Sequence, residues 1–330
     1  MADTIDNKII KMGMRAIRAA VFELNRLDPG IRSRITHDLG ARGKVRLSDK
    51  VANTAVSNVL DFFAKKYDIS IHIRNEDQEG DSSVLNPAGK KGMVYVDLDE
   101  LDGTINFNEL KGISTINLAF SELLQHKPTS LSYQDFRIGV VGTTAGNTYF
   151  GNTEHSYCVL SGRQLDKYQL TTSNLKDIKG ARVIADPYPP RIFSNQGETE
   201  ALLTGPFLEL DKITGRVIRS MCSASAEICG VLYVDHPNAS KSTVAWVSPC
   251  QPSENLIAGY IIAKGAGAII TDWKGQPIDK KPVAIGSRHE LTDIIISANE
   301  AVHEQLLKIF SPFADIWQEG YLKKAKEMYK

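Results

Sequence analysis

The hydrophobic pattern of this chain changes its period along the sequence, and that change limits the folds it can adopt. Apolar residues recur at helical spacing at about 6–27 and at 49–67. From residue 69 onward they alternate or run continuously, as in strands, and turn residues separate the runs. Up to residue 151 no helical segment intervenes, which favours an antiparallel sheet. The pattern predicts strands at 69–74, 92–98, 114–124, 136–142 and 147–151, and an exposed loop at 75–91.

Beyond about residue 175, strand-like and helical segments alternate. A chain of 330 residues suits one large domain or two ordinary ones. We therefore predict an N-terminal α+β domain at 1–175 with an antiparallel sheet, and a C-terminal α/β domain at 176–330. In the second domain the pattern predicts strands at 181–187, 215–220, 242–247, 266–273 and 293–299, helices at 198–210, 222–232, 253–264 and 299–310, and a lysine-rich surface helix at 311–330.

Charge and composition argue against several classes of function. Lys+Arg and Asp+Glu both total 39, so no global charge favours a nucleic acid or an anionic membrane as partner. No apolar run reaches the roughly 18 residues of a membrane-spanning helix, and the first residues do not have the form of a signal peptide. We expect a cytoplasmic protein with reduced, buried thiols, because no CxxC pair occurs among Cys158, Cys222, Cys229 and Cys250.

An acidic stretch, VDLDELDGTINF at 96–107, ends one of the predicted strands. Asp97 and Asp99 share a face because side chains alternate along a strand, and Asp102 lies just past the strand, where a turn can bring it beside Asp99. Gly103 permits close approach of a ligand, and a helix starting at Thr104 would offer N–H groups to an anion. Carboxylates with a phosphate nearby suit Mg²⁺. The residues alone also allow a solvated acidic turn with a capping aspartate.

The sequence resembles a known family at several places. LDELDGTINF (98–107) resembles the D-P-[IL]-D-G-[ST]-x-N-[FI] signature of the inositol monophosphatase / fructose-1,6-bisphosphatase superfamily. Residues 253–278 are similar to that family's W-D-x-A-(A/G) signature and the strand after it, 71–80 stand in the place of its GEE segment, and 293–310 resemble its closing strand and helix. The resemblance implies an αβαβα sandwich, a Mg²⁺-dependent phosphomonoesterase, and a homodimer or homotetramer.

The resemblance also implies which residues form a site. Two or three Mg²⁺ ions, which Mn²⁺ could replace, would neutralise the phosphate of a small substrate and activate the attacking water. Glu76 would hold that water and the Thr104 hydroxyl would orient it. The implied metal ligands are Glu76, Asp99, the Leu101 carbonyl, Asp102 and Glu254.

The same resemblance implies a substrate pocket. Gly103 and Thr104 would cradle the phosphate, and Ser223 and Ala224 would lie along the rest of the substrate. Inositol phosphate, fructose bisphosphate and a phosphonucleotide such as 3′-phosphoadenosine 5′-phosphate all remain candidates. A Walker loop is absent, the seven histidines are dispersed, and KGAGAI (264–269) runs from helix to strand, the reverse of a dinucleotide loop.

Several positions depart from the family pattern. Glu100 replaces a proline, Ser253 replaces a tryptophan, and Glu254 is one methylene longer than the aspartate it matches. Asn53 is the best match to an aspartate of the second helix, and Val247 stands where inositol-specific members have a glutamate. These departures weaken the case for inositol phosphate. They also keep open an alternative, a catalytically impaired member that acts as a binding or regulatory protein.

Overall fold

The structure is a computed structural model that describes residues 5–38, 44–75, 83–104, 106–110, 113–128, 130–161, 166–186, 197–219, 223–234, 242–283 and 291–323. The described strands form one large sheet of order β14-β11-β10-β9-β8-β6-β5-β3-β4 and a second of order β13-β12-β15-β18-β16, with two small two-stranded sheets, β1-β2 and β17-β7. The bounds in the large sheet are β3 Ser70–Asn75, β4 Ser83–Leu85, β5 Met93–Asp102, β6 Thr115–Ser121, β8 Phe136–Thr143, β9 Thr148–Asn152, β10 Ser156–Val159, β11 Lys167–Thr171 and β14 Tyr233–Val234. In the others they are β12 Arg182–Ala185, β13 Val217–Arg219, β15 Thr243–Pro252, β16 Ile269–Thr271, β18 Leu291–Ser297, β1 Ile35–Asp38, β2 Lys44–Arg46, β7 Leu131–Ser132 and β17 Pro282–Val283.

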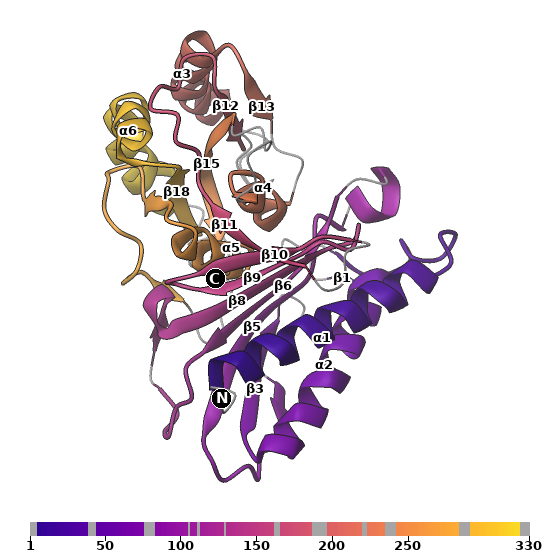
Figure 1. Cartoon of the computed structure of the whole chain (residues 1–330). Coiled ribbons are helices and arrows are strands. Elements are labelled where there is room, and N and C mark those ends of the chain that lie inside the picture. Colours follow the sequence, from indigo (N-terminus) through magenta and orange to yellow (C-terminus); the bar gives the residue numbers. More distant parts are fainter. Residues whose placement is uncertain are drawn as a thin grey trace.

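Helices cover both sheets and separate them (Figure 1). Helices α1 (Ile5–Arg26) and α2 (Leu47–Tyr67) lie on the outer face of the nine-stranded sheet. Helices α4 (Ala224–Gly230) and α5 (Ser253–Gly265) lie between the two sheets, and α3 (Gly197–Thr214) and α6 (Glu300–Asp315) cover the far face of the five-stranded sheet. The predicted αβαβα sandwich is therefore confirmed.

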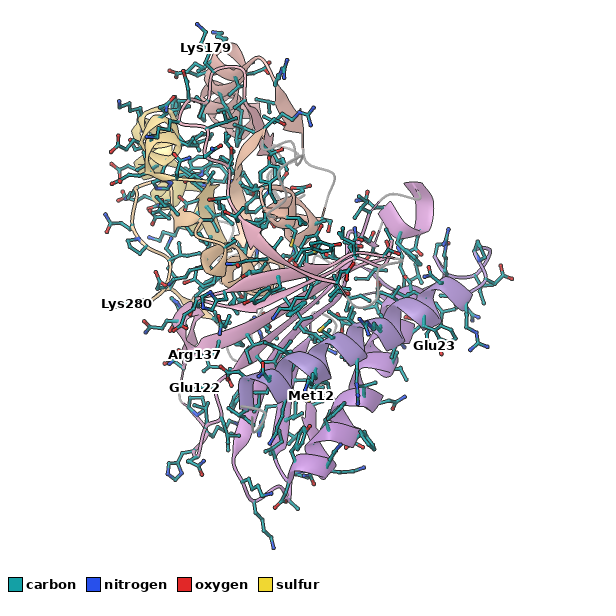
Figure 2. The ribbon with its side chains drawn as sticks, viewed as in Figure 1. Met12, Glu23, Glu122, Arg137, Lys179 and Lys280 are labelled. Carbon is teal, nitrogen blue, oxygen red and sulfur yellow. The ribbon has the colours of Figure 1, made fainter. Side chains whose placement is uncertain are left out.

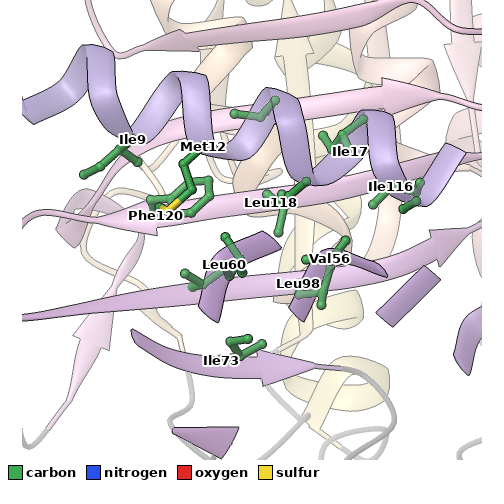
Figure 3. Packing of buried hydrophobic residues seen from close by; sticks show 14 of the residues in the cluster. Ile9, Met12, Ile17, Val56, Leu60, Ile73, Leu98, Ile116, Leu118 and Phe120 are labelled. Atoms are coloured by element: carbon green, nitrogen blue, oxygen red, sulfur yellow. The ribbon is translucent and has the colours of Figure 1, made fainter. Parts of the chain in front are cut away.

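Three hydrophobic clusters fill the four interfaces between these five layers, because the middle cluster covers both sides of α4 and α5. Figure 3 shows the first, in which Ile9, Met12 and Ile17 of α1 pack beside Val56 and Leu60 of α2 on the sheet. Buried residues recur every three or four positions along α1, as read from the sequence, because residues at this spacing share a helix face. The middle cluster joins α4 and α5 to both sheets, and the third packs α3 and α6 on β12, β15 and β18.

The large sheet is mixed, which corrects the prediction of an antiparallel one. Strand β3 pairs with β5 in parallel, whereas β5, β6, β8 and β9 pair antiparallel. The difference arises in the segment 75–91, predicted as an exposed loop. It contains β4, which pairs antiparallel with the outer side of β3. The chain then returns to the inner side of β3 and enters β5 in the same direction.

The C-terminal segment is also packed more closely than predicted. Helix α6 runs on to Asp315, and a π-helical segment, η5, follows at Ile316–Leu322. Ala314, Trp317 and Leu322 are buried in the third cluster, and Trp317 Nε1 donates a hydrogen bond of 2.6 Å to the carbonyl of Pro249. In its described part this segment is a core element, so the prediction of a surface helix at 311–330 is wrong there.

Two properties read from composition can be compared with the structure. None of the helices in the described ranges combines the length and apolar character needed to cross a bilayer. Cys158 and Cys229 are free and buried, as predicted, Cys250 is also buried, and Cys222 lies outside the described residues.

Gly139 of β8 allows α5 to pack closely on the large sheet. A Cβ there would lie 2.5 Å from the carbonyl oxygen of Ala258, a main-chain atom that cannot rotate away. We expect Gly139→Ala to lower the free energy of unfolding by about 1–3 kcal/mol, measured by urea denaturation. Gly320→Ala is the control, because a Cβ at Gly320 meets nothing within 4 Å. Equal loss of stability in both variants would contradict this account of the contact.

Candidate active site

The acidic stretch forms the end of β5 and the turn after it. The structure continues β5 through Asp102, where the sequence predicted the strand to end earlier, and the pairing with β6 is irregular between Asp99 and Asp102. Gly103 follows with φ 84°, in the region that favours glycine, and the chain turns away from the sheet. Asp99 and Asp102 are only 1% and 7% exposed. Two carboxylates are therefore buried at one strand end.

Asp102 is held by groups from both halves of the chain. Its Oδ2 accepts hydrogen bonds from the Ser225 N–H at 2.9 Å, the Ser223 hydroxyl at 3.1 Å and the Thr115 hydroxyl at 3.5 Å. Burial raises the pKa of Asp102 although the Ser225 hydrogen bond opposes this, and the buried Glu227 carboxylate raises it further. The structure thus brings the predicted residues Asp102 and Ser223 together, with buried Ala224 beside them.

Asp99 lies beside an oxygen that lacks a partner. Its Oδ2 accepts a hydrogen bond of 3.4 Å from Asn117 Nδ2, and its Oδ1 accepts one of 3.3 Å from the Leu101 N–H. Within the described residues, the buried Oδ1 of Asn117 meets no hydrogen-bond donor. A cation beside Asp99, or water bound to that cation, would satisfy this oxygen. Carboxylate and carbonyl oxygens are the ligands that Mg²⁺ prefers, so these residues fit such an ion.

Thr104 has a partner that the sequence analysis missed. Its hydroxyl lies 2.8 Å from the Leu101 carbonyl oxygen and 3.2 Å from Asp49 Oδ1, so it can donate to either. Asp49 stands in the first turn of α2, where its other oxygen accepts a hydrogen bond of 2.7 Å from the Arg46 N–H. Asp49, rather than Asn53, is thus the α2 residue that reaches the turn. An aspartate in the first turn of a helix is common as a cap, so the sequence does not single out Asp49.

Two of the departures from the family pattern form a pair on the other face of β5. Asn53 Nδ2 donates a hydrogen bond of 3.0 Å to Glu100 Oε1, and Ser57 donates one of 3.0 Å to Asn53 Oδ1. Glu100 is 2% exposed and faces α2, while its neighbour Asp99 faces the opposite side of the strand. The acidic stretch therefore has side chains on both faces of β5, with Glu100 toward α2 and Asp99 on the opposite face.

The predicted ligand Glu254 lies in the first turn of α5, close to the largely buried Arg74. Its Oε2 accepts a hydrogen bond of 3.3 Å from the Ser253 hydroxyl, and its charge lies within the field of Arg74. In the part of the chain that the structure describes, no three Asp, Glu, His or Cys side chains are close enough to hold one ion together. The ligand role of Glu254 stays a prediction, and Glu76 falls at 76–82, outside the described residues.

Solved structures of other proteins share the arrangement of layers seen in this chain. An inositol monophosphatase from Anabaena superposes with a TM-score of 0.60 at 16% identity, covering 93% of this chain and 96% of that one. A 2′-AMP complex of SaIMPase-II superposes with a TM-score of 0.63 at 13% identity, covering 96% and 99%. This chain has the fold of the inositol monophosphatase superfamily. The fold implied by the sequence resemblance is thereby confirmed.

One curated protein is similar to this chain in sequence. It is a bifunctional NADP phosphatase/NAD kinase from Methanococcus maripaludis, 27% identical over 234 residues. That region is 67% of this chain and only 36% of the archaeal protein, so the chain spans little more than a third of its relative. No family model matches the sequence.

The oxygen cluster at the end of β5 predicts a measurable cation affinity. We expect Asp99→Asn to weaken Mn²⁺ binding at least about tenfold, or about 1.4 kcal/mol, because it removes a buried anionic oxygen. Isothermal titration calorimetry of the metal-free protein measures this. Asp61→Asn on α2, whose partner is the exposed Lys65, is the control. If both variants bind Mn²⁺ like the wild type, the cation site is elsewhere.

Proposed function

We propose that this chain is a phosphomonoesterase that depends on a divalent cation, preferably Mg²⁺. The observation that carries the proposal is the pair of buried carboxylates, Asp99 and Asp102, beside the Asn117 oxygen, which has no donor among the described residues. Burying two carboxylates at one strand end is costly unless a positive charge joins them. The inositol monophosphatase-type fold and the name of the curated relative support a phosphatase.

Each residue of the turn has a distinct task in this proposal. Asp99, Asp102 and the Leu101 carbonyl would bind the cation, which neutralises phosphate charge and lowers the pKa of a bound water. In this proposal the Thr104 hydroxyl would donate its hydrogen bond to Asp49 Oδ1, 3.2 Å away, which leaves the lone pairs of the Thr104 oxygen to accept a hydrogen bond from the attacking water. Water and phosphorus would then be held in line, and positioning of this kind supplies a large part of catalysis.

Among phosphate esters we favour a nucleotide with a phosphate on its ribose 2′-hydroxyl. Two independent similarities support this choice. The curated relative is named for NADP phosphatase activity, and one structural neighbour was solved with 2′-AMP. NADP and 2′-AMP share a 2′-phosphate. A neighbour of the same name was also solved with inositol monophosphate, so that ester is the main competitor.

A substrate panel tests the proposal directly. We expect phosphate release from NADP and 2′-AMP in Mg²⁺, with smaller rates on inositol 1-phosphate, fructose 1,6-bisphosphate and 3′-phosphoadenosine 5′-phosphate. EDTA should abolish release, and Mn²⁺ should restore it, because the ligand set contains only oxygen. Full turnover after exhaustive chelation would contradict the cation requirement. Mn²⁺ binding without turnover on any ester would favour the impaired, binding-protein alternative.

The Asp49–Thr104 contact can be tested by a double-mutant cycle. We expect Thr104→Val and Asp49→Asn each to lower kcat by roughly tenfold to a hundredfold, because the hydroxyl is lost or loses its orientation. The double variant should be little worse than either single one, since both act through one hydrogen bond. Thr54→Val, an exposed α2 position, should leave kcat unchanged. Additive losses would show that Asp49 does not act through Thr104.

A further inference from the structure

A largely buried arginine, Arg74, stands behind the acidic turn, and the site described above gives it no role. Arg74 lies in β3, opposite Asp97 in the parallel pairing with β5. Its Nε and Nη2 atoms both lie 2.6 Å from Asp97 Oδ1. The Arg74 side chain is 15% exposed and that of Asp97 only 2%. Removing both charges of this ion pair from water costs free energy, so the pair calls for an explanation.

Arg74 also reaches across to the next layer. Its Nη2 donates a hydrogen bond of 3.1 Å to the hydroxyl of Ser253, the first residue of α5. The Ser253 hydroxyl in turn donates to Glu254 Oε2. Burial alone would lower the pKa of Arg74, but the negative charges of Asp97 and Glu254 outweigh it and raise that pKa, so the guanidinium stays charged. One side chain thus joins β3, β5 and the start of α5.

These contacts close a ring around the carboxylate turn. From Arg74 the ring passes through Ser253 into α5, whose Asn255 carbonyl accepts a hydrogen bond of 2.9 Å from the Ser225 hydroxyl. The Ser225 N–H donates to Asp102, and β5 leads back from Asp102 to Asp97 and Arg74. Contacts at Asp97 and at Asp102, on either side of Asp99, therefore link β5 to α5.

We propose, on the basis of the proposed function, that Arg74 is a positioning residue for the cation site. Its guanidinium fixes the first turn of α5 against β5 and so sets where Asp99 and Asp102 stand relative to α4 and α5. The proposal also accounts for Ser253, which replaces the tryptophan of the family signature. Serine at this position is small enough to leave room for a guanidinium and supplies the oxygen that it binds. Glu254 then acts as a second carboxylate partner of Arg74.

Two variants remove the positioning contact while keeping a charge at position 74. Ser253→Ala deletes only the link from Arg74 to α5. Arg74→Lys keeps the positive charge against Asp97, but an ammonium lacks the planar fork that donates to Asp97 and Ser253 together. Arg137→Lys is the matched control, because Arg137 forms an exposed pair with Glu122 at 3.3 Å on the rim of the large sheet (Figure 2).

The measurements are the melting temperature, the Kd of Mn²⁺ alone by calorimetry, and kcat on the best ester of the panel. We expect both variants to melt within a few degrees of the wild type. We also expect them to bind Mn²⁺ several-fold more weakly and to lose roughly tenfold in kcat, because the carboxylates are displaced. A purely structural role would instead lower the melting temperature and leave Kd and kcat unchanged.

The outcomes separate this proposal from the proposed function. Wild-type turnover with unchanged Kd and kcat in both variants would overturn the role of Arg74 alone. Mn²⁺ binding that weakens in the variants, without hydrolysis of any ester by the wild type, would overturn the phosphatase and keep the positioning role. A wild type that neither binds Mn²⁺ nor hydrolyses any ester would overturn both.

Discussion

The carboxylate of Asp102 joins the two halves of this chain by hydrogen bonds at the candidate site. It ends β5 in the large sheet, yet two of its donors, Ser223 and Ser225, come from the start of α4 in the second half. Hydrogen bonds to a buried carboxylate are strong because little water competes for them. Ser225 also binds α5 through the Asn255 carbonyl, so the position of one carboxylate fixes two helices against the sheet.

The face of β5 to which each acidic side chain points depends on an irregularity in the strand that the sequence does not predict. In a regular strand, Asp97 and Asp99 share one face, while Glu100 and Asp102 share the other. The structure keeps Glu100 against Asn53 of α2, but it returns Asp102 to the side of Asp97, where α4 lies. The register shift between Asp99 and Asp102 makes this possible, because a bulge inverts the alternation after it. A strand ending at Leu98, as the sequence predicted, would also leave Asp102 free to turn back beside Asp99.

Periodicity and local motifs predicted the layers, most helices and the acidic turn, because these depend on residues close together in the chain. The parallel pairing of β3 with β5, the partner Asp49 and the arginine Arg74 could not be predicted that way. Asp49 meets Thr104 only once α2 packs on β5, and Arg74 meets Ser253 only once α5 docks between the sheets. In the tail, the spacing of Ala314, Trp317 and Leu322 carried the signal of burial, but the abundant lysines obscured it.

Charge compensation explains how a chain of zero net charge can build an acidic site in its interior. Asp97 has the guanidinium of Arg74, and Glu100 has the amide of Asn53. Asp99 and Asp102 receive hydrogen bonds, and Asp102 also feels the repulsion of Glu227. Exposed charges farther away than about 8 Å are largely screened at physiological salt, so the nearby carboxylates, rather than the net charge of the chain, set the field at the turn. On the proposed function, a phosphate dianion would be repelled from this turn until a cation has bound, and the cation must therefore bind before, or together with, the ester.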